Sequence, residues 1–161
     1  VGLVGLSRGG MMNYLTLKEN YTDNIKAVVN IGGIADLERT IKHHPQIEEV
    51  ANELIPDFKN NRDAEIKKRS AINWVDKFPK STPILVLHGM KDQHVDYSQI
   101  LPFADSLQKY NIPYKVVSFE NDNHGIVNHK EIVMELINNW LDQYVKKTNP
   151  FDETITREIK K

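Results

Sequence analysis

The sequence predicts an α/β fold in which helices cover a parallel sheet. Four short apolar runs lack polar alternation, which is typical of strands buried on both faces of such a sheet. The segments between these runs suit helices, and strands joined through helices by right-handed crossovers lie parallel. With 161 residues, the chain has room for one hydrophobic core.

The predicted strands are the four apolar runs, at residues 1–6, 26–31, 83–88 and 114–119. A first helix is expected over 11–17 and another over 98–110, where Pro102 either starts the helix or kinks it. The last helix has the clearest pattern, because apolar side chains recur at helical spacing from Ile132 to Val145. We expect that helix to pack on the sheet.

Residues 34–78 differ from the rest, because they are polar, mostly helix-forming and contain no strand candidate. Short helices are predicted there around 37–43, 46–54 and 62–69. The segment is long for a single crossover, so we expect an excursion over one end of the sheet; a plain surface connection is the alternative. A single folded domain is expected to span 1–146, followed by a charged, loosely attached tail at 147–161.

Composition excludes several classes of function. The 21 basic and 22 acidic residues give a formal net charge of -1, so no overall field attracts nucleic acid or an anionic membrane. The absence of cysteine rules out disulfides, thiolate metal sites and a cysteine nucleophile. A chain without cysteine is compatible with the cytoplasm, where we expect the protein to reside. We expect neither a nucleic-acid nor a membrane partner.

The first strand leads into a G-x-S-x-G pattern, Gly5-Leu6-Ser7-Arg8-Gly9. Between a buried strand and a helix, this pattern indicates a tight turn that exposes its serine at the carboxyl end of the strand. We expect both flanking glycines to be required, because side chains there would collide with the strand and the helix.

A serine hydroxyl becomes a strong nucleophile only when a base takes its proton, and that base is usually a histidine oriented by a carboxylate. Both partners follow later strands in the order serine, acid, histidine. Asp92 comes after the third strand and His124 after the fourth.

These motifs resemble those of the α/β-hydrolases, and most closely the prolyl oligopeptidase-like serine peptidases. The resemblance covers about residues 1–145 and rests on the segments 5–10, 83–92 and 123–125. Members commonly carry H-G-x-x-D-x-x-V-P-x-x-Q around the acid. The matching positions here are His88, Gly89, Asp92, Val95 and Gln99, while Asp96 replaces the proline.

The resemblance implies that Ser7 is the nucleophile, Asp92 the orienting acid and His124 the general base. It also implies that the backbone N–H of Arg8 is one oxyanion-hole donor, with the second donor in a preceding loop. The expected reaction is cleavage of a peptide or ester bond through an acyl-enzyme, with a peptidase favoured. The alternatives are a small-molecule carboxylesterase and a catalytically silent fragment that acts as a binding module.

The position of Ser7 predicts that this chain is the C-terminal half of a domain of about 250 residues. The expected partners are a peptide or small ester substrate and a chain segment that completes the sheet. That segment would be the N-terminal half of the domain or a second copy of the chain.

Every assignment has a competitor in the sequence. For the acid, Asp96 is interpreted as a charge at a helix N-terminus and Asp122 as a loop carboxylate. The competing histidines are His43, His44, His88, His94 and His129. His88 is expected to be structural, with its ring bonded to a loop carbonyl, and His94 either lines the site or faces water.

Other polar and aromatic residues leave a choice open. The adjacent His43 and His44 would point to different sides of a helix, and the polar cluster at 92–96 lacks a recognisable ligand spacing, so neither a metal nor another cofactor is expected. The Arg8 side chain either contacts a substrate carboxylate or leaving group, or is solvated. Trp74 and Trp140 are assigned to the core, with the rim of the site as an alternative for Trp74.

Overall fold

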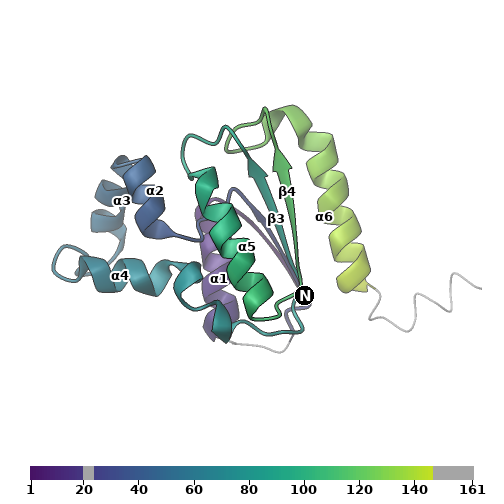
Figure 1. The fold of residues 1–161 in the computed structure, drawn as a ribbon, viewed down its shortest axis with the longest axis horizontal. Coiled ribbons are helices and arrows are strands. Elements are labelled where there is room, and N and C mark those ends of the chain that lie inside the picture. Colours follow the sequence, from purple (N-terminus) through teal and green to yellow (C-terminus); the bar gives the residue numbers. More distant parts are fainter. Residues whose placement is uncertain (20–23, 147–161) are drawn as a thin grey trace, which may run out of the picture.

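The computed structural model describes residues 1–19 and 24–146, so the tail predicted at 147–161 lies outside the described residues. Four parallel strands form one sheet in chain order (Figure 1). They are β1 (Gly2–Leu6), β2 (Ala27–Ile31), β3 (Ile84–Gly89) and β4 (Tyr114–Phe119). The predicted α/β architecture and its four strands are therefore confirmed.

Helices cover both faces of the sheet (Figure 1). On one face, α1 (Arg8–Glu19) and α5 (Ile100–Lys109) share an apolar cluster with the side chains of β2 and β3 that point toward them. On the other face, α6 (Lys130–Tyr144) packs on the alternate side chains of the same strands. Because β2 and β3 are covered on both sides, apolar side chains are favourable on either face, which explains the unbroken apolar runs.

The predicted ambiguity at Pro102 is resolved by its place in the first turn of α5, where no intrahelical N–H is needed. Trp74 and Trp140 are both buried in the apolar clusters, so Trp74 is a core residue rather than a rim residue. The Trp74 indole N–H donates to the Lys67 carbonyl at 3.1 Å.

The segment between β2 and β3 forms a helical lobe that projects to one side of the sheet (Figure 1). It contains the three predicted helices, α2 (Leu37–His43), α3 (Gln46–Leu54) and α4 (Arg62–Arg69). Two 3-10 turns, Ala71–Asn73 and Val75–Lys77, lead the chain back to the sheet. The predicted helical segment is therefore present, and it lies beside the sheet.

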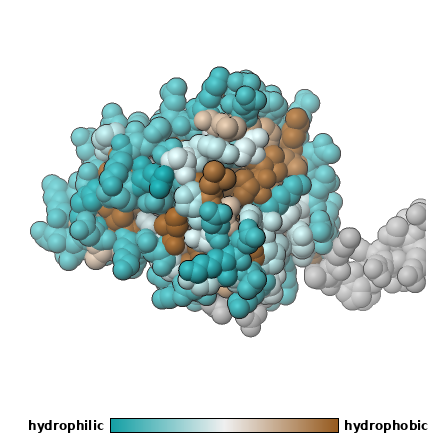
Figure 2. All heavy atoms as spheres, in the orientation of Figure 1, coloured by the Kyte–Doolittle hydropathy of each residue, from teal (hydrophilic) through white to brown (hydrophobic). Residues whose placement is uncertain are grey.

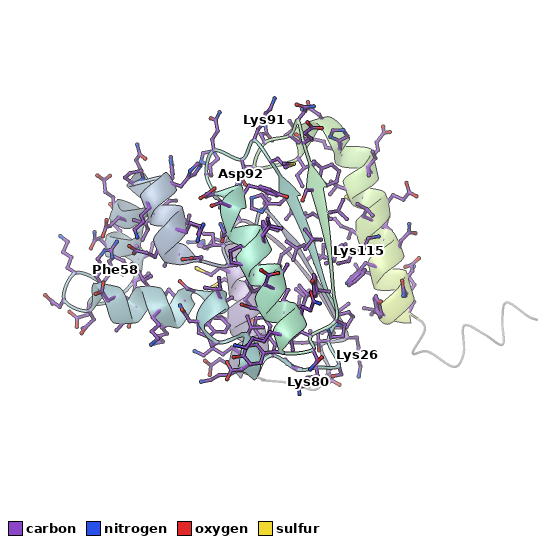
Figure 3. The ribbon with its side chains drawn as sticks, viewed as in Figure 1. Lys26, Phe58, Lys80, Lys91, Asp92 and Lys115 are labelled. Atoms are coloured by element: carbon purple, nitrogen blue, oxygen red, sulfur yellow. The ribbon has the colours of Figure 1, made fainter. Side chains whose placement is uncertain are left out.

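The lobe has an apolar cluster of its own, which includes side chains from α1 and from the loop after β3. Its buried members are Met11, Ile34, Leu37, Ile41, Ala51, Phe58, Ile66 and Val95. Phe58 lies inside the lobe in Figure 3. Within residues 1–19 and 24–146, no helix combines the length and apolarity needed to cross a membrane.

The two outer strands leave apolar surface uncovered. On β1, Val4 is 49% and Leu6 is 52% exposed. Figure 2 shows apolar surface at the opposite edge as well, over β4 between α5 and α6. An exposed apolar edge strand is a template for pairing with another chain.

We therefore expect the chain to self-associate through β1. Replacing Val4 and Leu6 by threonine should reduce the sedimentation coefficient or the aggregated fraction in analytical ultracentrifugation, because threonine keeps strand propensity and reduces apolar surface. The control is Leu101→Thr, which removes a 67% exposed apolar side chain from α5. A wild-type chain that sediments as a monomer would contradict this expectation.

Candidate active site

Ser7 occupies the turn between β1 and α1 in a left-handed backbone conformation, with φ of 55°. Its N–H donates to the Ile31 carbonyl at 2.9 Å, and its own carbonyl accepts from the Gly10 N–H at 2.9 Å. A serine at positive φ is strained and persists only where its surroundings hold it. The predicted tight strand-to-helix turn is present.

Glycine is required at two positions around this turn. A Cβ on Gly5 would lie 2.5 Å from the backbone carbon of Gly9, and a Cβ on Gly10 would lie 2.8 Å from the Cα of Gly33. A Cβ on Gly9 would meet nothing within 4 Å. The expectation that both flanking glycines are sterically required is therefore wrong for Gly9, because the crowding is at Gly5 and at Gly10, where the helix meets the chain leaving β2.

A buried asparagine holds the start of α1 against β2. Asn30 is fully buried, accepts from the Asn13 side-chain amide at 2.7 Å and donates to the Gly10 carbonyl at 3.2 Å. Beside it, burial raises the pKa of Tyr14, although a hydrogen bond with Asn30 acts in the opposite direction. Sequence reasoning missed Asn30, and the signal was a single amide in an otherwise apolar strand.

Asp92 lies just beyond β3 at the carboxyl end of the sheet, whereas Lys26 and Lys80 lie at the opposite end (Figure 3). Its side chain is buried, and Oδ1 accepts the backbone N–H groups of His94 at 2.8 Å and Val95 at 2.9 Å. Oδ2 lies 2.7 Å from Nδ1 of His124. Burial raises the pKa of Asp92, but the hydrogen bonds from His124, His88 and the backbone outweigh it and hold that pKa well below its usual range.

The loop that carries His124 is held against the end of β3 by backbone contacts. The Met90 N–H donates to the Phe119 carbonyl and the Lys91 N–H to the Asp122 carbonyl, both at 2.9 Å. A Cβ on Gly89 would lie 2.2 Å from the Asn123 carbonyl oxygen, so only glycine allows this approach. These contacts bring the loop after β4 to the loop after β3.

On its other side, His124 rests on the end of β2. A Cβ on Gly32, whose φ is 52°, would lie 3.0 Å from His124 Nδ1. The Gly32 N–H donates to the Leu87 carbonyl at 2.9 Å, which ties this glycine to β3. The imidazole is thus seated between Gly32 and Asp92.

The predicted residues therefore lie at the carboxyl end of the sheet. Asp92 and His124 are in direct contact, and Ser7 is bonded to Ile31, the residue before the glycine that supports His124. Among the residues that the structure describes, no hydrogen bond joins Ser7 to His124.

The competing carboxylates have the roles expected of them. Asp96 caps the 3-10 turn Tyr97–Gln99 by accepting the Ser98 N–H at 2.9 Å, and its φ of -56° is one that a proline also adopts. Asp122 is fully buried in the histidine loop and binds Nδ1 of His129 at 2.7 Å.

The other histidines lie around the site. His88 Nε2 is 3.0 Å from the Val95 carbonyl oxygen, as expected for a structural histidine. The exposed His94 packs its ring 5.1 Å from that of His124 and 5.2 Å from that of His44, so it lines the site. In the described part of the chain, no three or more His, Asp or Glu side chains are grouped to hold a metal ion.

Gln99 connects the lobe to the loop that carries the acid, and sequence reasoning found it only as a motif match. It is fully buried, and its Oε1 accepts the N–H groups of Ala35 at 2.7 Å and Asp36 at 2.9 Å. Its Nε2 donates to the Asp96 carbonyl at 2.9 Å. One amide therefore fixes where the lobe leaves the sheet.

A largely apolar cavity of about 630 Å³ opens beside Ser7, between α1 and the lobe. Its apolar lining comes from α1, the chain after β2, and α2 and α3 with the residue that follows: Met11, Met12, Ile34, Leu37, Ile47, Val50, Ala51, Leu54 and Ile55. Two arginines complete the lining. Arg69 is paired with Glu65, and Arg8 is exposed.

A parallel sheet, a serine in a strained turn before a helix, and an aspartate–histidine pair after later strands define an α/β-hydrolase fold. Residues 1–148 match the prolyl oligopeptidase family. The chain therefore belongs to that family, as its motifs predict.

Curated relatives of the chain are peptidases. It is 26% identical over 153 residues to dipeptidyl-peptidase 5 of Porphyromonas gingivalis. The matched region covers 91% of this chain and 22% of that protein. It is 24% identical over 124 residues to the uncharacterized peptidase YtmA of Bacillus subtilis. This match covers 77% of this chain and 47% of that protein. The chain thus spans less than half the length of either relative.

Solved structures share the fold. The acylaminoacyl peptidase of Pyrococcus horikoshii superposes with a TM-score of 0.77 at 20% identity, over 92% of this chain and 24% of that one. A puromycin-hydrolyzing peptidase of Mycobacterium tuberculosis superposes with a TM-score of 0.70 at 25% identity, over 89% of this chain and 22% of that one.

The glycine geometry predicts that two adjacent substitutions differ in sign. Gly10→Ala should lower the free energy of unfolding by about 1–3 kcal/mol, because its Cβ overlaps the Gly33 backbone. Gly9→Ala should leave it unchanged or raise it by up to about 1 kcal/mol, because the space is open and alanine favours helix. Urea denaturation of both variants tests this, and equal losses would contradict it.

The buried Asp122 predicts a pH-dependent contribution to stability. Burial raises its pKa, but hydrogen bonds from His129 and the backbone N–H groups of Asn123 and Asn128 outweigh it and lower the pKa. A carboxylate with a lowered folded-state pKa stabilises the fold above its unfolded-state pKa, about 4, and this contribution is lost as the pH falls.

We therefore expect Asp122→Asn to lower the melting temperature at pH 7 and to flatten its decline between about pH 5 and pH 3. The control is Asp105→Asn, which changes an exposed carboxylate on α5. Thermal unfolding followed by circular dichroism measures both. Parallel pH curves for wild type and Asp122→Asn would contradict the assignment.

Proposed function

We propose that this chain carries the catalytic residues of a serine peptidase that cleaves peptide bonds through an acyl-enzyme. One observation supports this most directly. The buried Asp92 binds Nδ1 of His124 at 2.7 Å at the carboxyl end of the sheet, the same end at which Ser7 lies in its strained turn. Family membership and the peptidase relatives support the same reaction class.

In the proposed mechanism, the Ser7 hydroxyl attacks the substrate carbonyl. Because Asp92 accepts the proton on His124 Nδ1, the Nε2 atom is unprotonated and can take the serine proton. The resulting imidazolium then protonates the leaving amine, and the acyl group stays on Ser7. A water molecule releases the acyl group by the same steps, with His124 again acting as base.

The start of α1 supplies positive potential for the oxyanion. The first N–H groups of a helix have no acceptor within it, and the helix dipole places partial positive charge there. The Arg8 N–H opens the twelve-residue helix α1 directly after Ser7 and is our proposed donor. We propose that a second donor comes from a segment outside this chain.

The cavity beside Ser7 suggests the substrate's character. Its volume of about 630 Å³ and its aliphatic and methionine lining suit an apolar side chain on the acyl part of a peptide. The exposed apolar edge of β1 further supports the proposal that another segment, upstream or from a second copy, completes the sheet.

A fluorophosphonate probe followed by peptide mass mapping tests the nucleophile. Labelling should occur at Ser7 and disappear in Ser7→Ala. Asp92→Asn should slow labelling by about four orders of magnitude, because His124 is then no longer held in the tautomer that leaves Nε2 free to accept the serine proton. The same reactions should be run on this chain alone and on a longer form that restores upstream sequence.

Ser98 provides an internal control for this experiment. Its Oγ is bonded to the Asp96 carboxylate and the Arg39 guanidinium, but no histidine is among its described partners. Labelling at Ser98, or at no serine in the longer form, would overturn the assignment of Ser7. Hydrolysis of p-nitrophenyl esters without hydrolysis of peptide anilides would favour the carboxylesterase alternative.

A further inference from the structure

A second histidine lies against the buried acid. His88 is fully buried at the end of β3, and its Nε2 is 3.0 Å from Oδ2 of Asp92, the same oxygen that binds His124. The mechanism above does not use His88. Its contact with the carboxylate was not foreseen from the sequence, which indicated only a bond to a loop carbonyl.

The surroundings of His88 fix its protonation. Nε2 is also 3.0 Å from the Val95 carbonyl oxygen, which can only accept a hydrogen bond, so Nε2 carries the proton. Nδ1 is buried without a hydrogen-bond partner. A proton there would be an unsatisfied buried donor, so His88 is the neutral Nε2–H tautomer.

The carboxylate of Asp92 is thereby surrounded by donors. Oδ1 accepts the N–H groups of His94 and Val95, while Oδ2 faces His124 and lies 3.0 Å from His88 Nε2, whose proton also faces the Val95 carbonyl. A carboxylate offers about four lone-pair sites, and all four are used. Removing His88 leaves more negative charge on the oxygen that faces His124.

We propose that His88 is a positioning residue for catalysis, which fixes Oδ2 of Asp92 and moderates its attraction for the protonated form of His124. This inference rests on the proposed roles of Asp92 and His124. His88 touches no reacting atom and acts only through the carboxylate.

Other groups that act on His124 must be held constant. His94 packs on the His124 ring, and His44 packs on His94 from the end of α2. Gly32, on the other side, brings no charge. Variants at position 88 leave all of these in place, so a change in His124 reports on Asp92.

The test compares His88→Leu, which removes the donor, with His88→Gln, whose amide restores an N–H at a similar reach. The matched control is Thr82→Val, because Thr82 is also buried beside β3 and donates to a loop carbonyl, that of Ile25, at 3.0 Å. This control removes a comparable hydrogen bond without touching Asp92.

Two readouts distinguish positioning from structure. In His88→Leu, the acid limb of the kcat/KM profile should move to higher pH, because His124 holds its proton more tightly, and kcat/KM should fall about tenfold with Asp92 less constrained. An NMR titration of the His124 imidazole in the unliganded protein should move in the same direction. His88→Gln should restore both, and Thr82→Val should lower only the melting temperature.

Unchanged titration of His124 in His88→Leu, or equal shifts in Thr82→Val, would overturn the proposal. If His88→Leu does not fold, the ¹⁵N chemical shifts of wild-type His88 still decide it, since a proton on Nδ1 contradicts the shared donor. A further outcome is that the His124 titration moves as expected in His88→Leu although the wild-type protein neither hydrolyses substrate nor reacts with the fluorophosphonate probe at Ser7. That outcome would count against the proposed function while supporting the role of His88.

Discussion

The site depends on the close approach of two loops, those that leave β3 and β4. A glycine at position 89 lets the carbonyl of Asn123 pass where a Cβ would stand, and two backbone hydrogen bonds fix the approach. Neither an acid nor a base is specified by this contact. It determines only that whatever follows the third strand meets whatever follows the fourth, and Asp92 and His124 occupy those places.

The loop after β4 takes part in two histidine–carboxylate pairs with different tasks. Asp122 and His129 lie within one loop, so their bond organises the loop itself. Asp92 and His124 come from different strands, so their bond joins two parts of the fold. Both carboxylates are buried and have lowered pKa values, and the surrounding hydrogen bonds are the cause in each case. A lowered carboxylate pKa alone would therefore not identify the acid of a catalytic triad.

Local patterns in the sequence predicted the features that are themselves local. The strands, the turn around Ser7 and the three helices of the lobe follow from apolar runs, glycine and helix-forming segments. Ser7, Asp92 and His124 each follow a predicted strand. Because parallel strands have their carboxyl ends on the same side of a sheet, the sequence predicted that the three residues lie at that end.

Features that depend on packing between distant segments were not predictable in this way. The open space at Gly9, the buried amides of Asn30 and Gln99, and the second histidine on Asp92 arise from the packing of separate elements. Identical residue patterns are compatible with other contacts at each of these positions. Only the three-dimensional arrangement distinguishes them.

Val95 belongs to two systems at once. Its side chain is buried in the apolar cluster of the helical lobe, while its N–H holds Oδ1 of Asp92 and its carbonyl accepts from His88. The lobe that lines the cavity is therefore mechanically linked to the carboxylate. A change in the shape of the lobe that moves Val95 would therefore also move the backbone groups that contact Asp92 and His88.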